Sequence, residues 1–446
     1  MKMTKYKLGE LVEVTRGASL SGQFYAEEGK LIRLTLGNFN MNGGGFKENT
    51  SKTDLYFTGT VRDEFILNKG DIITPLTEQS LGLLGTTARI PESGKYIQSQ
   101  DVALVRCKEG LLDPNFCYYL ISSSIVRQQL SAAAQQTKIR HTSPKKIKDC
   151  TVWVPDFEVQ KNIGRILTDI DNKIAINRRI NDNLEAMAKQ LYDYWFVQFD
   201  FPNEEGKPYK SSGGAMAWNE KLKREIPKEW MASNYTNLFT IGNGQTMPQN
   251  EGLVPAYGGN GIVKMVEISN YPACIIIGRV GANCGSIHYS KIPCWVSDNA
   301  ISICSKNDDW QPFLFYSLKL YNLSKNKGGS SQPLITHEAL KHLYFPMSEK
   351  HINQFCHIVN ELQDLIYSNQ QEILKLTKQR DELLPLLMNG QATVNYHLSA
   401  KVYPLPIAYK KAMPIVANQT ISNIFNQKSD SHTPSPCLQT SQIRCS

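Results

Sequence analysis

The chain contains the same pattern twice, and this internal repeat constrains its fold more than any other feature. An offset of 197 residues aligns Asp101–Cys107 with Asp298–Cys304 and matches identical Asp, Ala and Cys residues. In each copy an apolar strand is followed by a short aromatic helix that begins at a proline. The same offset pairs the aromatic positions of these helices, Phe116 with Phe313 and Tyr119 with Tyr316. Each half of the chain is therefore predicted to contain one mixed α+β unit.

Each predicted unit leads into a long helix whose apolar residues recur in steps of four and three. The seam positions are Ile163, Leu167, Ile170, Ile174, Asn177, Leu184 and Leu191 in the first helix, and Val359, Leu362, Ile366, Asn369, Ile373, Leu376 and Leu383 in the second. An offset of 192 residues superposes the two seams and aligns Asn177 with Asn369. A seam sustained over about five heptads is typical of a coiled coil, in which a buried asparagine pair fixes the register. We expect the helices to pair antiparallel; the alternative is that each helix packs separately on its own unit.

The predicted fold class is α+β, with two mixed α/β domains separated by an antiparallel coiled coil and related by pseudo-two-fold symmetry. The predicted segments are residues 1–155 (first domain), 156–200 (first helix), 201–230 (linker), 231–346 (second domain), 347–393 (second helix) and 394–446 (basic tail). Gly, Pro and Ser are frequent in the linker, as is usual for connecting segments. Prolines interrupt any long helix in the polar tail, which is therefore predicted to be mostly disordered.

Charge and composition exclude several classes of protein. The 446 residues include 49 Lys+Arg and 41 Asp+Glu, and the net charge of +8 is too small to indicate nucleic-acid binding by itself. About half of that excess lies in the tail, and most of the remainder lies in the two domains. No apolar run approaches the ~18 residues of a membrane span, and the N-terminus does not resemble a signal peptide. Ten cysteines without a Cys-x-x-Cys pair fit a reducing cytosol, so a cytoplasmic location is expected.

Catalytic signatures are missing from the sequence. It contains no phosphate-binding loop, no glycine-rich dinucleotide motif, no Asn/Asp-Pro-Pro-aromatic methyltransferase loop and no carboxylate cluster beside a lysine. His141, His288 and His337 are isolated in the sequence. The cysteines at 274, 284, 294 and 304 recur every ten residues, a spacing that does not match a zinc knuckle, and are predicted to be core residues on strands. No catalytic, cofactor or metal site is predicted in this chain.

The remaining chemistry is that of nucleic-acid binding. Loops at equivalent places before the two long helices are rich in Lys and Arg, which neutralise phosphates, and in Ser, Thr and Gln, which reach phosphates or base edges. Arg279 is the only arginine in residues 231–346 and is the favoured candidate for bidentate contact with guanine. The candidates for DNA contact are Arg16, Lys138, Arg140, Thr142, Lys145, Lys146, Lys264, Arg279, Asn283, Lys325, Lys327, Ser331 and Gln332. For each lysine the alternative is a solvated surface charge.

Several motifs carry a resemblance to a known family. They are Leu191–Pro202, Gly206–Gly214 and Glu225–Trp230 in mid-chain, Gly329–Pro333 ahead of the second helix, and Arg380–Gln391 near its end. Together with the repeat, they make residues 1 to about 393 resemble the specificity subunit of type I restriction-modification enzymes.

The resemblance implies two target recognition domains, each reading half of a split DNA sequence, and helical conserved regions that dock two modification subunits. It also implies that the chain is not an enzyme. Adenine methylation, cleavage and translocation would belong to modification and restriction subunits, which use S-adenosylmethionine, ATP and Mg²⁺. Two features depart from the family pattern: the tail, and the unequal placement of Gln160 and Gln354 at the starts of the helices. The rival hypotheses are a coiled-coil scaffold without DNA contact and a self-sufficient nuclease or methyltransferase.

Overall fold

The computed structural model describes residues 2–40, 44–78, 82–133, 140–281, 283–321, 323 and 335–392. These residues form two compact units. Unit 1 takes its residues from Met1–Asn177 and from Gln371 onward, and unit 2 takes its residues from Arg178–Gln370. The predicted tail at 394–446 lies outside the described residues.

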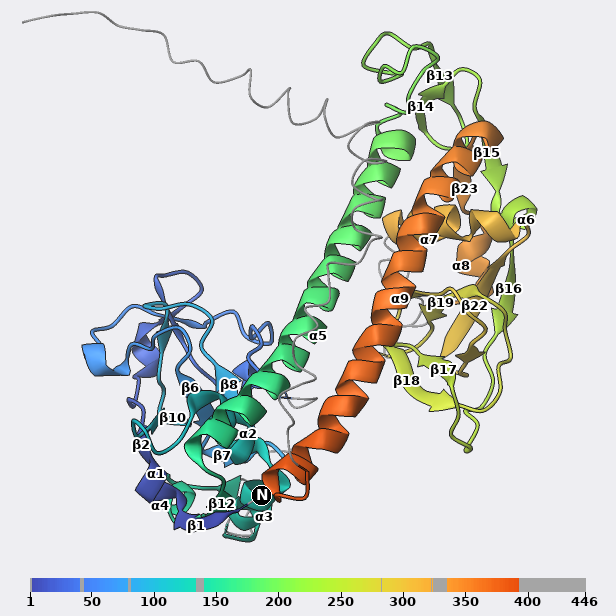
Figure 1. Ribbon diagram of the computed structural model, residues 1–446. Helices are drawn as coiled ribbons and strands as arrows, with labels where there is room; N and C mark the ends of the chain where they lie inside the picture. The colour runs from blue at the N-terminus through green and yellow to red at the C-terminus, as the bar shows by residue number, and fades with distance from the viewer. Residues whose placement is uncertain are drawn as a thin grey trace, which may run out of the picture. The chain divides into compact units, whose positions relative to one another are not determined.

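The two units repeat one sheet order (Figure 1). The sheet of unit 1 has the order β2-β10-β6-β8, formed by Val12–Arg16, Val102–Cys107, Ile72–Pro75 and Ala88–Arg89. The sheet of unit 2 has the order β16-β22-β19-β20, formed by Phe239–Asn243, Ala300–Ser305, Cys274–Gly278 and Ile287–Ser290. Neighbouring strands are antiparallel in both sheets. The repeat predicted from the sequence is therefore confirmed, because both units have the same strand order in the main sheet.

Smaller strand pairs follow the same plan. An antiparallel pair stands beside the start of each long helix: β1–β12 (Thr4–Lys7 with Thr151–Val154) and β15–β23 (Met231–Asn234 with Tyr344–Met347). Each unit also has one parallel pair: β4–β9 (Leu31–Arg33 with Tyr96–Ile97) and β17–β21 (Val254–Gly258 with Trp295–Val296). In unit 2, β18 (Gly261–Val266) pairs with the other edge of β17 and makes this a three-stranded sheet.

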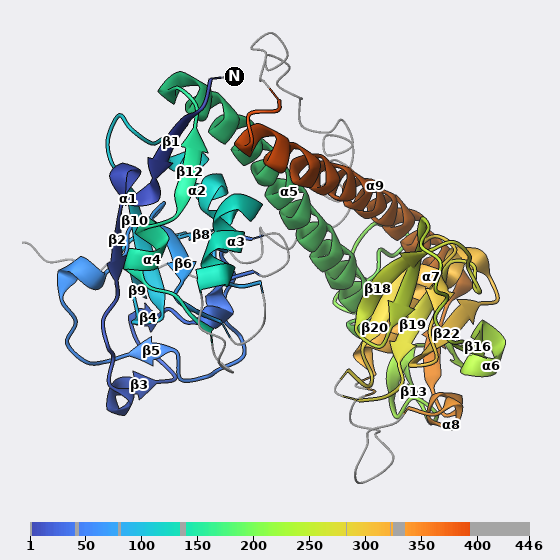
Figure 2. The same cartoon turned by 90° about the horizontal axis from the view of Figure 1, so that it is seen from below.

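Short aromatic helices pack on the two main sheets, as the sequence predicted (Figure 2). Helix α2 (Pro114–Ser122) begins at Asp113, whose carboxylate accepts a hydrogen bond from the backbone N–H of Phe116 at 2.9 Å. Helix α7 (Gln311–Leu320) is buried along nearly its whole length. Because these helices cover the sheets, every residue of the inner strands β6 and β19 is buried, and these strands are almost continuously apolar.

The long helices are α5 (Phe157–Tyr192) and α9 (Glu349–Met388), and every predicted seam position on them is buried or half-buried. In unit 1, Asp171 of α5 pairs with Arg380 of α9 at 2.9 Å, and Lys173, two residues later, pairs with Glu372 at 3.6 Å. The partners run in opposite directions, so the prediction of an antiparallel pair is confirmed. The alternative of two separately packed helices is excluded.

The aligned asparagines of the seam are buried, but each has a different partner. Asn177 donates to a carboxylate oxygen of Glu372 at 2.7 Å in unit 1. Asn369 donates to the side-chain oxygen of Asn181 at 2.9 Å in unit 2. The expected pairing between the two aligned asparagines is therefore replaced by two separate polar contacts, because the side chains that face them differ.

The segment predicted as a linker is folded. It contains a hairpin of β13 (Met216–Asn219) and β14 (Arg224–Pro227). Aromatic side chains at its two ends enter the core of unit 2, where the rings of Phe201 and Trp230 stack with centroids 5.0 Å apart. The Gly, Pro and Ser content indicated a connection correctly, but the aromatic residues around it bury enough apolar area to order it.

His351 in the first turns of α9 adds a titratable group to this aromatic cluster. Its ring centroid lies 4.0 Å from that of Phe201, and its Nδ1 is 2.7 Å from the Ser348 hydroxyl. Burial, with a smaller contribution from Lys350, lowers the pKa of His351 to about 4. The imidazole is therefore neutral in the folded protein near pH 7.

We expect unit 2 to lose stability as the pH falls from about 6.5 to about 4. In that window the unfolded chain binds a proton at His351 and the folded chain does not, so folding becomes less favourable. Because the side chain is partly exposed, the loss should be about 1–2 kcal/mol. Urea unfolding at pH 7 and pH 5 should show a smaller change for His351→Gln. The exposed His357→Gln serves as the control, and equal pH dependence in both variants would contradict this assignment.

Candidate DNA-reading loops

The connection between the third and fourth strands of the main sheet occupies the same place in both units. In unit 1 it begins with β7 (Thr77–Glu78), which pairs with β11 (Arg140–His141). The backbone N–H of Thr142 also donates to the carbonyl of Leu76 at 2.8 Å. In unit 2 the backbone N–H of Ile335 donates to the carbonyl of Arg279 at 3.0 Å. In each unit this loop therefore contacts the segment that precedes the short helix α4 (Pro144–Lys148) or α8 (His337–Lys341).

Glu78 organises the loop of unit 1. Its side chain is only 2% exposed, and one carboxylate oxygen accepts the backbone N–H groups of Gly82, Leu83 and Leu84 at 2.9–3.1 Å. The other oxygen pairs with the guanidinium of Arg140 at 3.0 Å. Hydrogen bonds to an ionised carboxylate are stronger than neutral ones. The Glu78 carboxylate therefore fixes both the turn and the strand that follows α3.

Arg140 is consequently held within unit 1. Besides the ion pair with Glu78, its guanidinium donates to the carbonyl and hydroxyl oxygens of Ser131 in α3 (Ser124–Ala133). Its positive charge is offset by a buried carboxylate, so its main contribution is to position the loop. The predicted contact of Arg140 with DNA is not tested by these contacts and stays a prediction.

The other candidates in unit 1 lie in different environments. The side chain of Lys145 is exposed and has no hydrogen bond or ion pair to any described residue. Lys146 donates to the carbonyl of Ala133 at 2.8 Å. The Thr142 hydroxyl is buried and makes no hydrogen bond within the described part of the chain.

Arg16 stands at the end of β2, where it is exposed and its Nε donates to the carbonyl of Gln100 at 2.8 Å. Lys138 lies outside the described residues.

The loop of unit 2 is held by its own backbone and by two neighbouring segments. Gly285 donates to the carbonyl of Gly278 at 2.8 Å, and Arg279 donates through its backbone N–H to Asn299 at 2.9 Å. The Ser286 hydroxyl donates to the carbonyl of Gly259. A Cβ at position 278 would lie 2.5 Å from the carbonyl oxygen of Asn283, so only glycine fits there.

These contacts leave the polar side chains of the unit 2 loop available. The guanidinium of Arg279 is half-buried and Asn283 is exposed, and neither side chain bonds to a described residue. Lys264 on β18 donates instead to the carbonyl of Pro248. The candidates Lys325, Lys327, Ser331 and Gln332 lie outside the described residues.

The cysteines spaced by ten residues lie in the core of unit 2. Cys274 and Cys294 are fully buried with their sulfur atoms 3.6 Å apart, and Cys284 is also buried. Cys284 lies in a turn and Cys294 in an isolated β-bridge, so the prediction that all four stand on strands is wrong for these two residues. Within the described ranges, no group of three or more His, Cys, Asp or Glu side chains could hold a metal ion. No described helix is long and apolar enough to cross a membrane.

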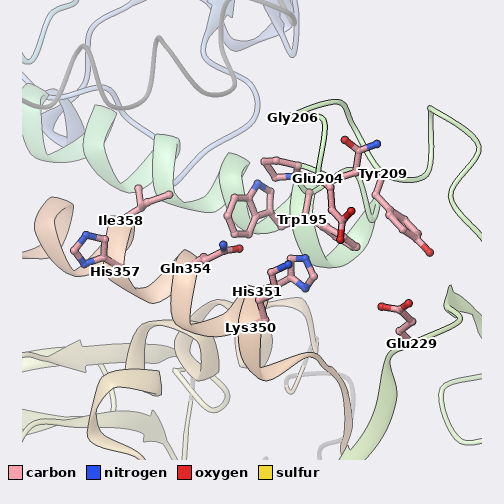
Figure 3. A pocket seen from close by; sticks show the side chains of 13 residues that line it. Trp195, Glu204, Gly206, Tyr209, Glu229, Lys350, His351, Gln354, His357 and Ile358 are labelled. Carbon is pink, nitrogen blue, oxygen red and sulfur yellow. The ribbon is translucent and has the colours of Figure 1, made fainter.

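A pocket of about 720 Å³ lies in unit 2 between the start of α9 and the folded segment after α5 (Figure 3). Its wall includes Trp195, Tyr209, Glu204, Glu229 and His351. The indole N–H of Trp195 is buried and has no partner among the described residues. Most of the residues that line the pocket lie between 195 and 229, in or beside the mid-chain motifs. They are distant in sequence from the candidate DNA-contact residues.

Glu78 was missed by the sequence analysis. Cations and hydroxyl groups are the side chains expected to contact nucleic acid, whereas a carboxylate repels phosphate. The available signal was its position, directly after a buried strand and four residues before Gly82. That signal does not identify the partner, because Arg140 is distant in the chain.

Comparison with known proteins gives a consistent result. Residues 1–186 and 227–383 match the family model described as the type I restriction modification DNA specificity domain. The MjaIX specificity subunit of Methanocaldococcus jannaschii is 23% identical over 316 residues, covering 64% of this chain and 71% of that protein. The putative MjaX specificity subunit of the same organism is 24% identical, covering 77% and 85%. The crystal structure of a type I S subunit from M. genitalium matches with a TM-score of 0.58 and 19% identity, covering 87% of this chain and 96% of that one.

Replacing Glu78 with alanine should destabilise unit 1 by about 2–4 kcal/mol, because three backbone donors and Arg140 lose their acceptor. Glu78→Gln should fall between this variant and the unmodified protein. The matched control is Glu92→Ala, which breaks an exposed 3.0 Å pair with Lys95 and should cost far less stability. The free energy of unfolding in urea measures both effects, and equal losses at the two positions would refute the organising role of Glu78.

Proposed function

The chain belongs to the type I restriction modification DNA specificity family, and from this premise we propose that each of its two units reads one half of a bipartite DNA target. A specificity subunit is non-catalytic, and the cofactors of the complex belong to the modification and restriction subunits. The chain works as part of a complex with DNA and partner subunits. Neither a self-sufficient enzyme nor a scaffold without DNA contact fits this family.

The observation that carries the proposal is the repeated placement of one loop on one sheet order. The β6–β8 loop and the β19–β20 loop each follow an inner strand and each contact the segment before a short helix. A shared scaffold with different loop side chains can read two different sequences in the same manner. Arg279, Asn283, Lys145 and Thr142 are the described candidates whose side chains have no partner in the described chain.

The paired helices would set the distance between the two half-sites. Residues of both α5 and α9 belong to each unit, so each helix is a continuous link between the units. Helices of 36 and 40 residues measure about 54–60 Å at 1.5 Å per residue. Two modules that read the same face of DNA must lie about 34 Å apart or a multiple of that distance. The helices are also the proposed docking region for two modification subunits, with restriction subunits joining the complex in the cytoplasm.

We expect Arg279→Ala to weaken binding of the assembled complex to its target by about 10–100-fold, because bidentate contact with guanine contributes roughly 1–3 kcal/mol of discrimination. The loss should be confined to duplexes that carry one particular guanine in one half-site. Fluorescence anisotropy on the target and its single-base variants measures this. Lys228→Ala, an exposed residue after β14, is the control and should bind like the unmodified protein. A uniform loss on all duplexes would indicate a phosphate contact and contradict base reading.

Inserting one heptad at facing positions of both long helices should change the length of the spacer between the half-sites, because seven residues add ~10.5 Å to each helix. The half-site sequences should stay the same. Mapping methylated adenines in a host that carries the variant measures both properties. Insertion into α5 alone should abolish methylation by breaking the seam. An unchanged spacer in the double insertion would refute the measuring role.

A further inference from the structure

We propose that Val280 is a specificity-determining residue that contacts the C5-methyl group of a thymine in the half-site read by unit 2. The inference rests on the proposed function, since it requires the β19–β20 loop to enter the major groove. It adds a second reading contact of different chemistry beside Arg279.

The backbone directly before Val280 is held by hydrogen bonds. The N–H of Arg279 donates to Asn299 and its carbonyl accepts from Ile335, so two distant segments hold the residue before Val280. The carbonyl of Arg279 also accepts a contact from the Cys284 thiol at 3.2 Å. A side chain on this backbone is presented at a set position before any ligand arrives, which reduces the entropy lost on binding.

Val280 is apolar and 36% exposed in this fixed turn. Single exposed apolar residues are common on protein surfaces, so exposure alone would indicate nothing. Two neighbours distinguish this position. On one side is Arg279, whose guanidinium is without a partner in the described chain. On the other is Gly281 at φ +73°, where an added Cβ would find no atom within 4 Å, so the tip of the turn faces open space.

The chemistry of valine restricts what this turn can read. In the major groove the thymine methyl is the apolar group that distinguishes a T·A pair, and apolar side chains recognise it by contact. Valine is β-branched and stiff at χ1, so its methyl groups have defined positions. Consecutive Cα atoms are 3.8 Å apart, close to the 3.4 Å rise of a base pair. The thymine is therefore expected in the same base pair step as the guanine that Arg279 contacts.

The test removes the methyl group from the DNA. After the target has been identified by mapping methylated adenines, each thymine of the unit 2 half-site is replaced in turn by deoxyuridine, which lacks only the C5-methyl. Binding is measured by fluorescence anisotropy with the assembled complex. One such replacement should weaken binding by the unmodified protein about fourfold, the effect of one buried methyl group. The same replacement should have no effect on Val280→Ala.

Two further variants test whether the effect is specific to the methyl groups at position 280. Val280→Thr retains one methyl group and the shape of the side chain, and should keep part of the sensitivity to deoxyuridine. Val263→Ala removes another exposed valine, on β18, and should keep all of it. Thermal unfolding of each variant should match the unmodified protein, because the valines are exposed.

The outcomes separate this inference from the proposed function. If Arg279→Ala weakens binding but no deoxyuridine replacement distinguishes Val280→Ala from the unmodified protein, the thymine contact is wrong and DNA reading by the loop stands. A unit 2 half-site without thymine overturns the inference in the same way. If Arg279→Ala also binds every duplex normally, the loop does not read DNA and both proposals fail.

Discussion

The antiparallel pairing of the two long helices is the constraint on which the rest of the structure depends. Each helix contributes residues to both units, so its register against its partner fixes which side chains each unit receives. Apolar seams alone tolerate slippage by a heptad, whereas buried polar groups do not, because a slip would leave them unpaired. Each unit has polar pairs of this kind between α5 and α9: Asp171–Arg380 and Asn177–Glu372 in unit 1, and Asn181–Asn369 in unit 2. Tyr119 of unit 1 extends this set by donating to Asp171 at 2.6 Å.

The two units hold corresponding loops by different chemistry on the same sheet. In unit 1 a buried carboxylate gathers three backbone donors and an arginine. In unit 2 the residue that follows the inner strand, Arg279, donates its backbone N–H to the carbonyl of Asn299 and accepts the backbone N–H of Ile335. The sheet order is kept because its strands are buried and a changed register would expose apolar residues. The loops are free to differ because only their anchoring points, not their side chains, are determined by the core.

The repeat and the helix pairing could be predicted because they depend on periodic apolar patterns that a sequence displays directly. The partners of Asn177 and Asn369 could not be predicted, because alignment of equivalent positions does not say which side chains face each other. The same limit applies to Arg140, whose partner Glu78 is 62 residues earlier and belongs to a different strand. The folded segment around Phe201 and Trp230 was interpreted from its glycines and prolines, although its aromatic residues determine its packing. Local composition therefore identified where a connection lies, and long-range burial decided whether it is ordered.

The cationic side chains also differ in whether they bond to groups of their own unit. Arg140, Lys146 and Lys264 donate to groups of their own unit, so these cations help to hold the segments that they contact. Arg140 is also neutralised by Glu78, which removes one of the charges that would otherwise attract phosphate. Lys146 and Lys264 donate to neutral carbonyl groups, so both keep their full positive charge. Under the proposed function, discrimination would depend on a few side chains of the two loops, where each wrong base leaves a specific contact unmade.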